Sequence, residues 1–280
     1  MIDVVIVGAG LPSCVLAAAL SRRQRPPSVL VVDDRPWVGG HEADQRCRET
    51  DVPLGATRYL DAASDEAIIA ALARDVRMSP VGCAAKPGWE RRVYPQGGWS
   101  AACRRLLDGA DVVLGAAGVE NLPRILAEAK TVYWTPRLDH LPHREWGGWE
   151  LLGNRLVSRR GRPTSAAWLA YRDVQVTRCL LPDDQPPEAE GPRGRILNHR
   201  RIVGGDSRLG TVETPMAPLL VSVKNRWPSD PGIDDARTQL DMAKANYPNL
   251  QLMGRLAHYR PMSLGSELAE AMALGEAFGR

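Results

Sequence analysis

Two glycines and a serine near the start of the chain have the types and spacing of a nucleotide-binding turn. Gly8 and Gly10 lie in the segment VVIVGAGLPSC, and Ser13 stands where the fingerprint G-x-G-x-x-G has its third glycine. The first glycine of such a turn permits a tight bend, the second lets the backbone approach a pyrophosphate, and the third lets helix and strand pack closely. Because Gly8 and Gly10 keep the two positions that face the ligand, we expect Ser13 to widen the gap between helix and strand slightly without abolishing binding.

An acidic residue and a glycine doublet follow in the segment DDRPWVGGH. Asp33 lies 20 residues after Ser13, where a carboxylate can accept hydrogen bonds from ribose hydroxyls. The doublet Gly39 and Gly40 comes directly afterwards and is typical of flavoproteins of the glutathione-reductase class, in which the chain passes over the cofactor at this point. These residues together predict a dinucleotide site.

The elements that would hold these residues form a strand, a helix and a second strand. Residues 3–7 are an apolar, β-branched run, typical of a strand buried on both faces of a parallel sheet. Residues 13–22 are rich in Ala and Leu and predict a helix, and residues 28–32 predict a second strand that ends at Asp33. This βαβ unit is the context in which the glycine pattern is informative.

The rest of the chain predicts more parallel strands and one antiparallel portion. Helices are expected at residues 64–74, 99–107, 122–129, 234–246 and 263–278, and strands at 110–115, 131–134, 219–224 and 250–253. Alternating segments between residues 146 and 181 favour antiparallel strands, and the Pro-rich, charged stretch 182–195 favours an exposed loop. The expected fold class is α/β: a Rossmann-like parallel sheet of the glutathione-reductase type with an inserted antiparallel β-sheet domain.

We expect three parts along the chain. The nucleotide-binding domain comprises residues 1–60, 97–136 and 249–280. Residues 61–96 form a shortened helical insert, and residues 137–248 form an antiparallel-sheet substrate domain.

Composition excludes several classes of partner. The net charge of +3 is too small to favour nucleic acid, and no stretch reaches the roughly 18 apolar residues of a membrane span. Five cysteines without a C-x-x-C pair favour neither a disulfide framework nor a zinc site. A cytoplasmic protein is therefore expected, with no nucleic acid or membrane partner, and a homodimer is left open.

Seven segments of the chain resemble, in the same order, the UDP-galactopyranose mutase family: VVIVGAGLPSCVLAAAL, VLVVDDRPWVGGH, LGATRYLD, YPQGGW, TVYWTPRLDH, VTRCLL and LMGRLAHYRPM. Members of that family are flavoenzymes that interconvert the six- and five-membered ring forms of a nucleotide-linked sugar. The resemblance implies an isomerase, a pyranose/furanose mutase acting on a UDP- or GDP-hexose, with FAD as cofactor and a nucleotide-diphosphate sugar as its partner.

The resemblance also implies site residues. The residues expected to contact the cofactor are Gly8, Gly10, Ser13, Asp33, Asp34, Arg35, Gly39, Gly40 and Gly254. The expected catalytic residues are Arg255, between flavin and substrate, and Arg178 and Tyr259, at the diphosphate. Thr57, Tyr59 and Tyr171 are expected substrate contacts. Arg91, Arg92 and Tyr94 are also expected to contact the substrate, because their segment RRVYPQGGW lies near the expected mouth of the site, where they can compensate for a missing substrate lid.

The chain also departs from that family. Thr57 replaces a histidine beside the flavin, and only residues 74–98 occupy the place of a helical domain that carries the substrate lid. Two alternatives therefore stay open. One is a mutase that works without flavin, with no cofactor or with Mg²⁺ or Mn²⁺. The other is a flavin-binding oxidoreductase or partner protein without mutase activity.

A divalent metal site is a separate, weaker hypothesis. Its candidate ligands are Asp33, Asp34, His41, Glu42 and Asp44. The competing interpretation is that Asp33 contacts ribose and that the other charges are solvated, and no metal ligand is assigned on this pattern.

Overall fold

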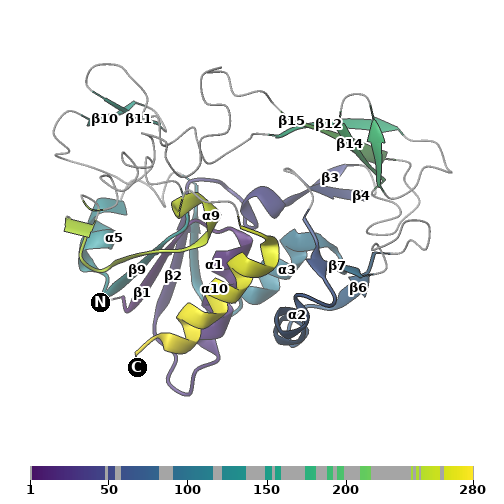
Figure 1. The fold of residues 1–280 in the computed structure, drawn as a ribbon. Coiled ribbons are helices and arrows are strands. Elements are labelled where there is room, and N and C mark those ends of the chain that lie inside the picture. The colour runs from purple at the N-terminus through teal and green to yellow at the C-terminus, as the bar shows by residue number, and fades with distance from the viewer. Residues whose placement is uncertain are drawn as a thin grey trace.

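A five-stranded parallel sheet forms the centre of the computed structural model (Figure 1). Its strands, in spatial order, are β8 (Asp111–Leu114), β2 (Val29–Asp33), β1 (Val4–Val7), β9 (Thr131–Trp134) and β16 (Leu250–Leu252). Numbered along the chain, this order is the 3-2-1-4-5 arrangement of a doubly wound fold. The order reverses between β1 and β9, and ligands of such folds bind outside the carboxyl ends of the strands at this point.

The structure describes residues 2–47, 50–53, 58–81, 91–115, 122–136, 149–152, 155–158, 174–180, 188–191, 194–198, 209–215, 241, 244–245, 247–258 and 262–279. None of the helices within these ranges combines the length and the apolar run needed to cross a membrane.

Strand β1 shows why an unbroken apolar run forms the middle of the sheet. Val4 and Ile6 point into one hydrophobic cluster, and Val5 and Val7 point into a second cluster on the opposite face. All four side chains are at most 5% exposed. Both faces of the strand are therefore covered, as the sequence predicts for a parallel sheet.

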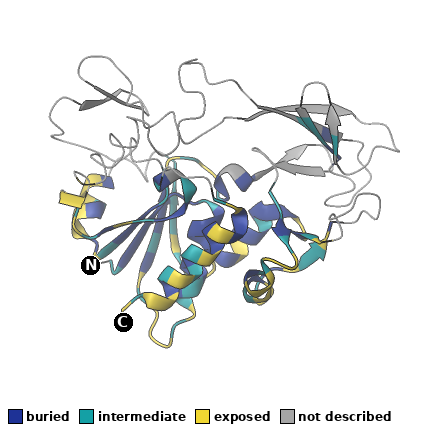
Figure 2. Cartoon of the chain, in the orientation of Figure 1, coloured by how far each residue is buried: buried dark blue, intermediate teal, exposed yellow. Residues whose placement is uncertain are grey.

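Helices cover the two faces of the sheet (Figures 1 and 2). The first cluster contains residues of α1 (Leu11–Ser21), α3 (Gly98–Leu106) and α10 (Leu264–Ala277), and the second contains α5 (Leu122–Glu128). Helix α10 packs directly on α1, so the last helix of the chain lies against the first. The expected helices and strands of the parallel part are thus confirmed.

An antiparallel sheet lies between β9 and β16 in the chain, as expected. Its strands, in spatial order, are β12 (Val174–Leu180), β15 (Leu209–Pro215), β14 (Gly194–Asn198) and β13 (Glu188–Gly191). A separate hairpin joins β10 (Trp149–Leu152) to β11 (Arg155–Ser158).

One part of the sequence interpretation is wrong in this sheet. The Pro-rich stretch 182–195 was expected to be an exposed loop, but β13 and the first residues of β14 fall within it and pair with each other. Leu197 of β14 is fully buried in the first hydrophobic cluster. Pairing of β13 with β14 and of β14 with β15, together with the burial of Leu197, holds these residues in the sheet.

Several smaller elements lie around the parallel sheet. Strands β3 (Asp44–Cys47) and β4 (Thr50–Pro53) form a hairpin, and β5 (Leu60–Asp61), β7 (Arg92–Pro95) and β6 (Met78–Pro80) form a three-stranded sheet beside helix α2 (Glu66–Leu72). A 3₁₀ turn, η1 (Gly40–Glu42), and a short helix, α9 (Gly254–Ala257), are the remaining elements among the described residues. The described part of 61–96, expected as a helical insert, thus holds α2, the strands β6 and β7 and the last residue of β5, and the three-part division of the chain stays a prediction.

Two expected elements lie wholly or mostly outside the described residues. The strand at 219–224 lies outside the described residues, and of the helix at 234–246 only residues 241 and 244–245 are described, all helical.

Candidate functional site

The loop from β1 to α1 lies at the point where the strand order reverses. Gly8 has a φ of +91°, and a Cβ at this position would overlap the hydroxyl of Thr135 at the end of β9. At Gly10, in contrast, the nearest atom to an added Cβ is Cδ of Pro12, 3.8 Å away. Gly8 is therefore required by its backbone and its neighbour, whereas Gly10 leaves open space that a ligand can approach.

Ser13, at the third-glycine position, is fully buried. Its hydroxyl donates to Oγ1 of Thr135 over 3.3 Å, and Thr135 in turn donates to the carbonyl oxygen of Val7 over 2.7 Å. The serine therefore links the first turn of α1 to the ends of β9 and β1 by hydrogen bonds.

The N-terminus of α1 is suited to an anion. Gly10 is its N-cap, no side chain caps the helix there, and the first turn contains no acidic residue. The 11-residue helix directs the positive end of its dipole to the carboxyl edge of the sheet, where a phosphate or diphosphate is stabilised.

Asp33 is buried at the end of β2 and holds the loop in place. Its Oδ2 accepts from the backbone N–H of Ala9 over 2.6 Å, and its Oδ1 accepts from the backbone N–H of Arg35 over 2.9 Å. Burial raises the pKa of Asp33, against the effect of these two hydrogen bonds. Since each carboxylate oxygen has two lone pairs, Asp33 can still accept from a ribose hydroxyl, and that role stays a prediction.

Arg35 and Asp34 flank this carboxylate. The Nε of Arg35 lies 3.5 Å from Oδ1 of Asp33 and 3.9 Å from Oδ1 of Asp34. The side chain of Asp34 is 46% exposed, so it faces solvent beside the buried Asp33.

The glycine doublet lies over the β1–α1 loop. The N–H of Gly39 donates to the carbonyl oxygen of Ala9 over 2.7 Å, and Gly39 pairs with Gly10 in a parallel bridge. Gly39 and Gly40 have φ values of +102° and +59°, and a Cβ at Gly40 would lie 3.1 Å from Cα of Gly10. Only glycines allow the chain to lie this close over the loop.

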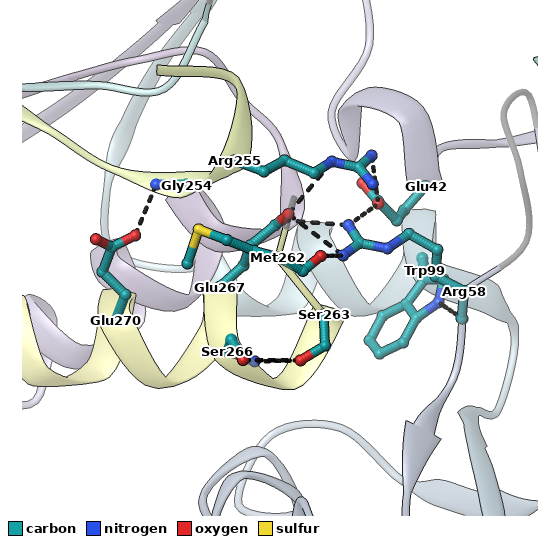
Figure 3. A network of polar contacts seen from close by, with 10 residues as sticks. All are labelled: Glu42, Arg58, Trp99, Gly254, Arg255, Met262, Ser263, Ser266, Glu267 and Glu270. Carbon is teal, nitrogen blue, oxygen red and sulfur yellow. Dashed lines mark hydrogen bonds and ion pairs between the residues drawn. The ribbon is translucent and has the colours of Figure 1, made fainter. Parts of the chain in front are cut away.

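Four charged side chains from distant parts of the sequence meet near this loop, and we call Glu42, Arg58, Arg255 and Glu267 the charge cluster (Figure 3). Arg58 lies in the centre: its Nη1 is 3.0 Å from Oε1 of Glu42 and 3.2 Å from Oε2 of Glu267. Its Nη2 donates to Oε1 of Glu267 over 3.2 Å and to the carbonyl oxygen of Met262 over 3.1 Å.

Arg255 completes the charge cluster from α9. Its Nε lies 3.2 Å from Oε1 of Glu267, and its Nη2 lies 3.9 Å from Oε1 of Glu42. The side chain of Arg255 is 23% exposed, compared with 13% for Arg58 and at most 6% for the two glutamates. Arg255, expected from the sequence, is thus the member of the cluster with most access to solvent.

Burial changes the proton affinity of two members. It raises the pKa of Glu267, against the opposing effect of the Arg58 and Arg255 guanidinium groups. For Arg58, burial lowers the pKa but the charges of Glu42 and Glu267 outweigh it, so the pKa is raised overall. The guanidinium of Arg58 therefore stays charged inside the protein.

A second glutamate of α10 holds the other side of α9. Oε2 of Glu270 accepts from the backbone N–H of Gly254 over 2.8 Å, and Oε1 lies 2.8 Å from Nε2 of His258. Gly254 has a φ of +81° and follows β16, so α9 begins at the carboxyl edge of the sheet. Glu267 and Glu270, one turn apart on α10, together fix α9 at this edge.

The structure brings three of the expected substrate contacts together. The rings of Tyr59 and Tyr94 meet edge to face with centroids 5.9 Å apart, and the guanidinium of Arg92 lies 5.3 Å from the centroid of the Tyr59 ring. Arg195 of β14 lies 5.6 Å from the same centroid and was missed because its segment was interpreted as a loop. Arg91 forms an ion pair with Asp61 over 2.7 Å.

Other expected residues cannot be placed. Thr57, Tyr171 and Tyr259 lie outside the described residues, and of Arg178 only the backbone is described, opposite Thr211 in β15.

Sequence reasoning missed the roles of Arg58 and Glu267. A usable signal existed for Glu267, because it lies among Leu264, Leu268 and Ala271 on the buried face of the last helix. A charged residue on an apolar face is rarely buried unless it is paired.

The described residues contain no group of three His, Cys, Asp or Glu side chains that could hold a metal ion. Of the candidate ligands, Asp33 is engaged with the β1–α1 loop and Glu42 with Arg58. The side chains of His41 and Asp44 are outside the described set.

Comparison with known families finds one match. Residues 6–74 match the NAD(P)-binding Rossmann-like domain. This range runs from the second half of β1 through α1, β2 and the glycine doublet to α2. A comparison with curated proteins finds no sequence match.

Solved structures resemble the chain over nearly its whole length. Putrescine oxidase covers 98% of this chain and 98% of its own, with a TM-score of 0.54 and 10% identity. An Exiguobacterium protein assigned as a protoporphyrinogen oxidase covers the same shares with a TM-score of 0.51 and 10% identity. An oxidoreductase from Methanosarcina mazei covers 98% of this chain and 100% of its own, with a TM-score of 0.50 and 10% identity.

These comparisons correct the predicted enzyme class. The three structures that share the fold are oxidoreductases, so the isomerase expectation is wrong, and the relationship to UDP-galactopyranose mutase is not supported. Residues 6–74 are thus similar to the NAD(P)-binding Rossmann-like domain, and the fold of the chain is similar to that of these three structures.

Proposed function

We propose that the chain binds FAD at the carboxyl edge of its parallel sheet and acts as a flavin-dependent oxidoreductase. The observation that carries this proposal is the open side of Gly10, which lies between the N-terminus of α1 and the covering glycine doublet. FAD, the cofactor expected from the sequence, is supported by the Rossmann-like family match together with the oxidoreductase fold.

The residues at this edge fit the parts of a flavin dinucleotide. The N-terminus of α1 can face the diphosphate, and the missing side chain of Gly10 lets the diphosphate approach the backbone. Asp33 can accept from the ribose hydroxyls of the adenosine. FAD, when bound, supplies the capacity to accept a hydride or electrons from a substrate.

The substrate is a further part of the proposal. Tyr59, Arg92 and Tyr94, which lie together, remain candidate substrate contacts, and Arg255 remains a candidate catalytic residue. A nucleotide-diphosphate sugar, expected from the resemblance, remains a compound to test for binding rather than an assigned substrate.

The cofactor is tested on the purified full chain. The protein should show the visible absorption bands of oxidised flavin, or should acquire them after incubation with FAD and gel filtration. In a thermal-shift series with FAD, NAD and NADP, FAD at 100 times its dissociation constant should stabilise the fold by about 2.7 kcal/mol.

A glycine variant tests the place of binding. In Gly10→Ala the new Cβ meets no protein atom within 3.8 Å and the φ of −71° suits alanine, so the free protein should remain as stable as the wild type. The same Cβ would occupy the approach to the diphosphate, so FAD should bind at least about tenfold more weakly, or about 1.4 kcal/mol. Unchanged FAD affinity in this variant would place the cofactor elsewhere.

A further inference from the structure

We propose that the charge cluster positions Arg255 beside the cofactor site and sets the electrostatic potential there, so that its four residues tune the affinity and the reduction potential of the bound flavin. This inference rests on the proposed function, because it concerns the same site. Glu42, Arg58 and Glu267 are positioning residues in this account, and Arg255, the candidate catalytic residue, is the side chain that they position.

The cluster is balanced in charge. Two carboxylates and two guanidinium groups sum to zero, and each glutamate contacts both arginines (Figure 3). Neutralising one member therefore changes the summed charge of these four residues by one unit, to positive for a glutamate and to negative for an arginine.

The cluster is connected to the dinucleotide loop through the glycine doublet. Glu42 ends the turn η1, which begins at Gly40, and Gly40 lies in close contact with Gly10. Arg255 reaches the same carboxylate of Glu42 from α9, at the carboxyl end of β16. The cluster thus joins the segment that covers the β1–α1 loop to the helix at the edge of the sheet.

Because the cluster is buried, a change in its charge should act strongly on a cofactor bound nearby. Glu42 and Glu267 are at most 6% exposed and Arg58 is 13% exposed, so water and salt screen them much less than surface charges. A positive charge near a flavin favours the reduced form, which carries more negative charge, and it also favours the diphosphate of the bound dinucleotide. A negative charge has the opposite effect on both.

The direction in which each variant shifts the FAD affinity and the reduction potential distinguishes this electrostatic role from a purely structural one. If the cluster only held the fold together, loss of any member would loosen the site, and every variant would bind FAD more weakly. In the electrostatic account, neutral glutamate variants and neutral arginine variants shift the potential and the affinity in opposite directions.

The experiment uses the full-length protein loaded with FAD and four neutral variants: Glu42→Gln, Glu267→Gln, Arg58→Gln and Arg255→Gln. We expect the reduction potential of bound FAD to rise and its dissociation constant to fall in both glutamate variants. We expect the potential to fall and the dissociation constant to rise in both arginine variants.

Glu276→Gln is the matched control, because it removes the same charge from an exposed position near the end of α10. Its potential and affinity should equal those of the wild type. If the Arg58 or the Glu267 variant fails to fold, Arg255→Gln and Glu42→Gln still provide one change of each sign.

The outcomes distinguish the two proposals. A wild-type protein that binds no FAD overturns the proposed function and this inference with it. A wild-type protein that binds FAD, with variants that all shift in the same direction or match the Glu276→Gln control, overturns this inference and leaves the proposed function standing.

Discussion

Ser13 shows at the level of a single residue why a departure from the fingerprint is tolerated. Its hydroxyl is buried and donates to Thr135, whose own hydroxyl donates to Val7. A serine at this position therefore replaces close packing by a hydrogen-bonded link between helix and sheet.

Removal of this hydroxyl should have a measurable cost. In Ser13→Ala, the partly buried hydroxyl of Thr135 loses a hydrogen-bond donor, and we expect the free energy of unfolding to fall by about 0.5–1.5 kcal/mol. Urea denaturation measures it, with Ser64→Ala as the control, because Ser64 is exposed. If the Ser13 and Ser64 variants lose the same stability, the hydrogen bond contributes nothing.

Asp3 allows a test of the electrostatics away from the site. The ammonium of Lys130 and the N–H and hydroxyl of Ser28 lower the pKa of Asp3 from 3.8 to about 2. Since the lowered pKa belongs to the folded state, the ionised carboxylate stabilises the protein above pH 3.8, and this contribution disappears as the pH falls toward 2.

Carbon-13 NMR of the Asp3 carboxyl measures this pKa directly. The midpoint should lie at about 2 in the wild type and move toward 3.8 in Lys130→Met, where the largest cause is removed. A wild-type midpoint near 3.8 would contradict the ion pair.

Among the elements, those with strong periodicity were predictable and those held by distant contacts were not. The run VVIV and the Ala- and Leu-rich helix after it form β1 and α1 as expected. Strands β5, β6 and β7 escaped prediction, because they are short and lack the continuous apolar run that marks β1. Their stability comes from pairing with one another and not from local propensity.

Helix α10 carries a prediction about packing between elements. Gly275 faces α1, and a Cβ there would lie 2.6 Å from Cβ of Ala19. Helix propensity alone predicts that Gly275→Ala stabilises the protein by about 1 kcal/mol. We expect instead a loss of about 1–3 kcal/mol, since the two helices must move apart. Thermal or urea unfolding shows whether Gly275→Ala is more stable or less stable than the wild type.

At the scale of the whole molecule, the parallel sheet and the antiparallel insertion followed from the sequence, whereas the strand order comes from the structure and the predicted activity was wrong. The segments VVIVGAG and VLVVDD, which carried much of the resemblance to a mutase, form β1, its turn and β2. A dinucleotide-binding βαβ unit needs this pattern whichever reaction the protein catalyses. The resemblance to the mutase family therefore indicated the fold and not the activity.

The charge cluster could not be read from the sequence for a related reason. Its members lie at positions 42, 58, 255 and 267, and only the closed fold brings η1, α9 and α10 together. Helix and strand periods extend over only a few residues. They therefore cannot predict contacts between segments about 200 residues apart.

The most direct test of the account is the visible spectrum of the purified protein after incubation with FAD and gel filtration. The account predicts that oxidised flavin elutes with the wild-type chain in stoichiometric amount and is largely lost from the equally stable Gly10→Ala variant. A wild-type protein that stays colourless and separates completely from FAD would contradict the assignment of a flavin site to the carboxyl edge of the sheet.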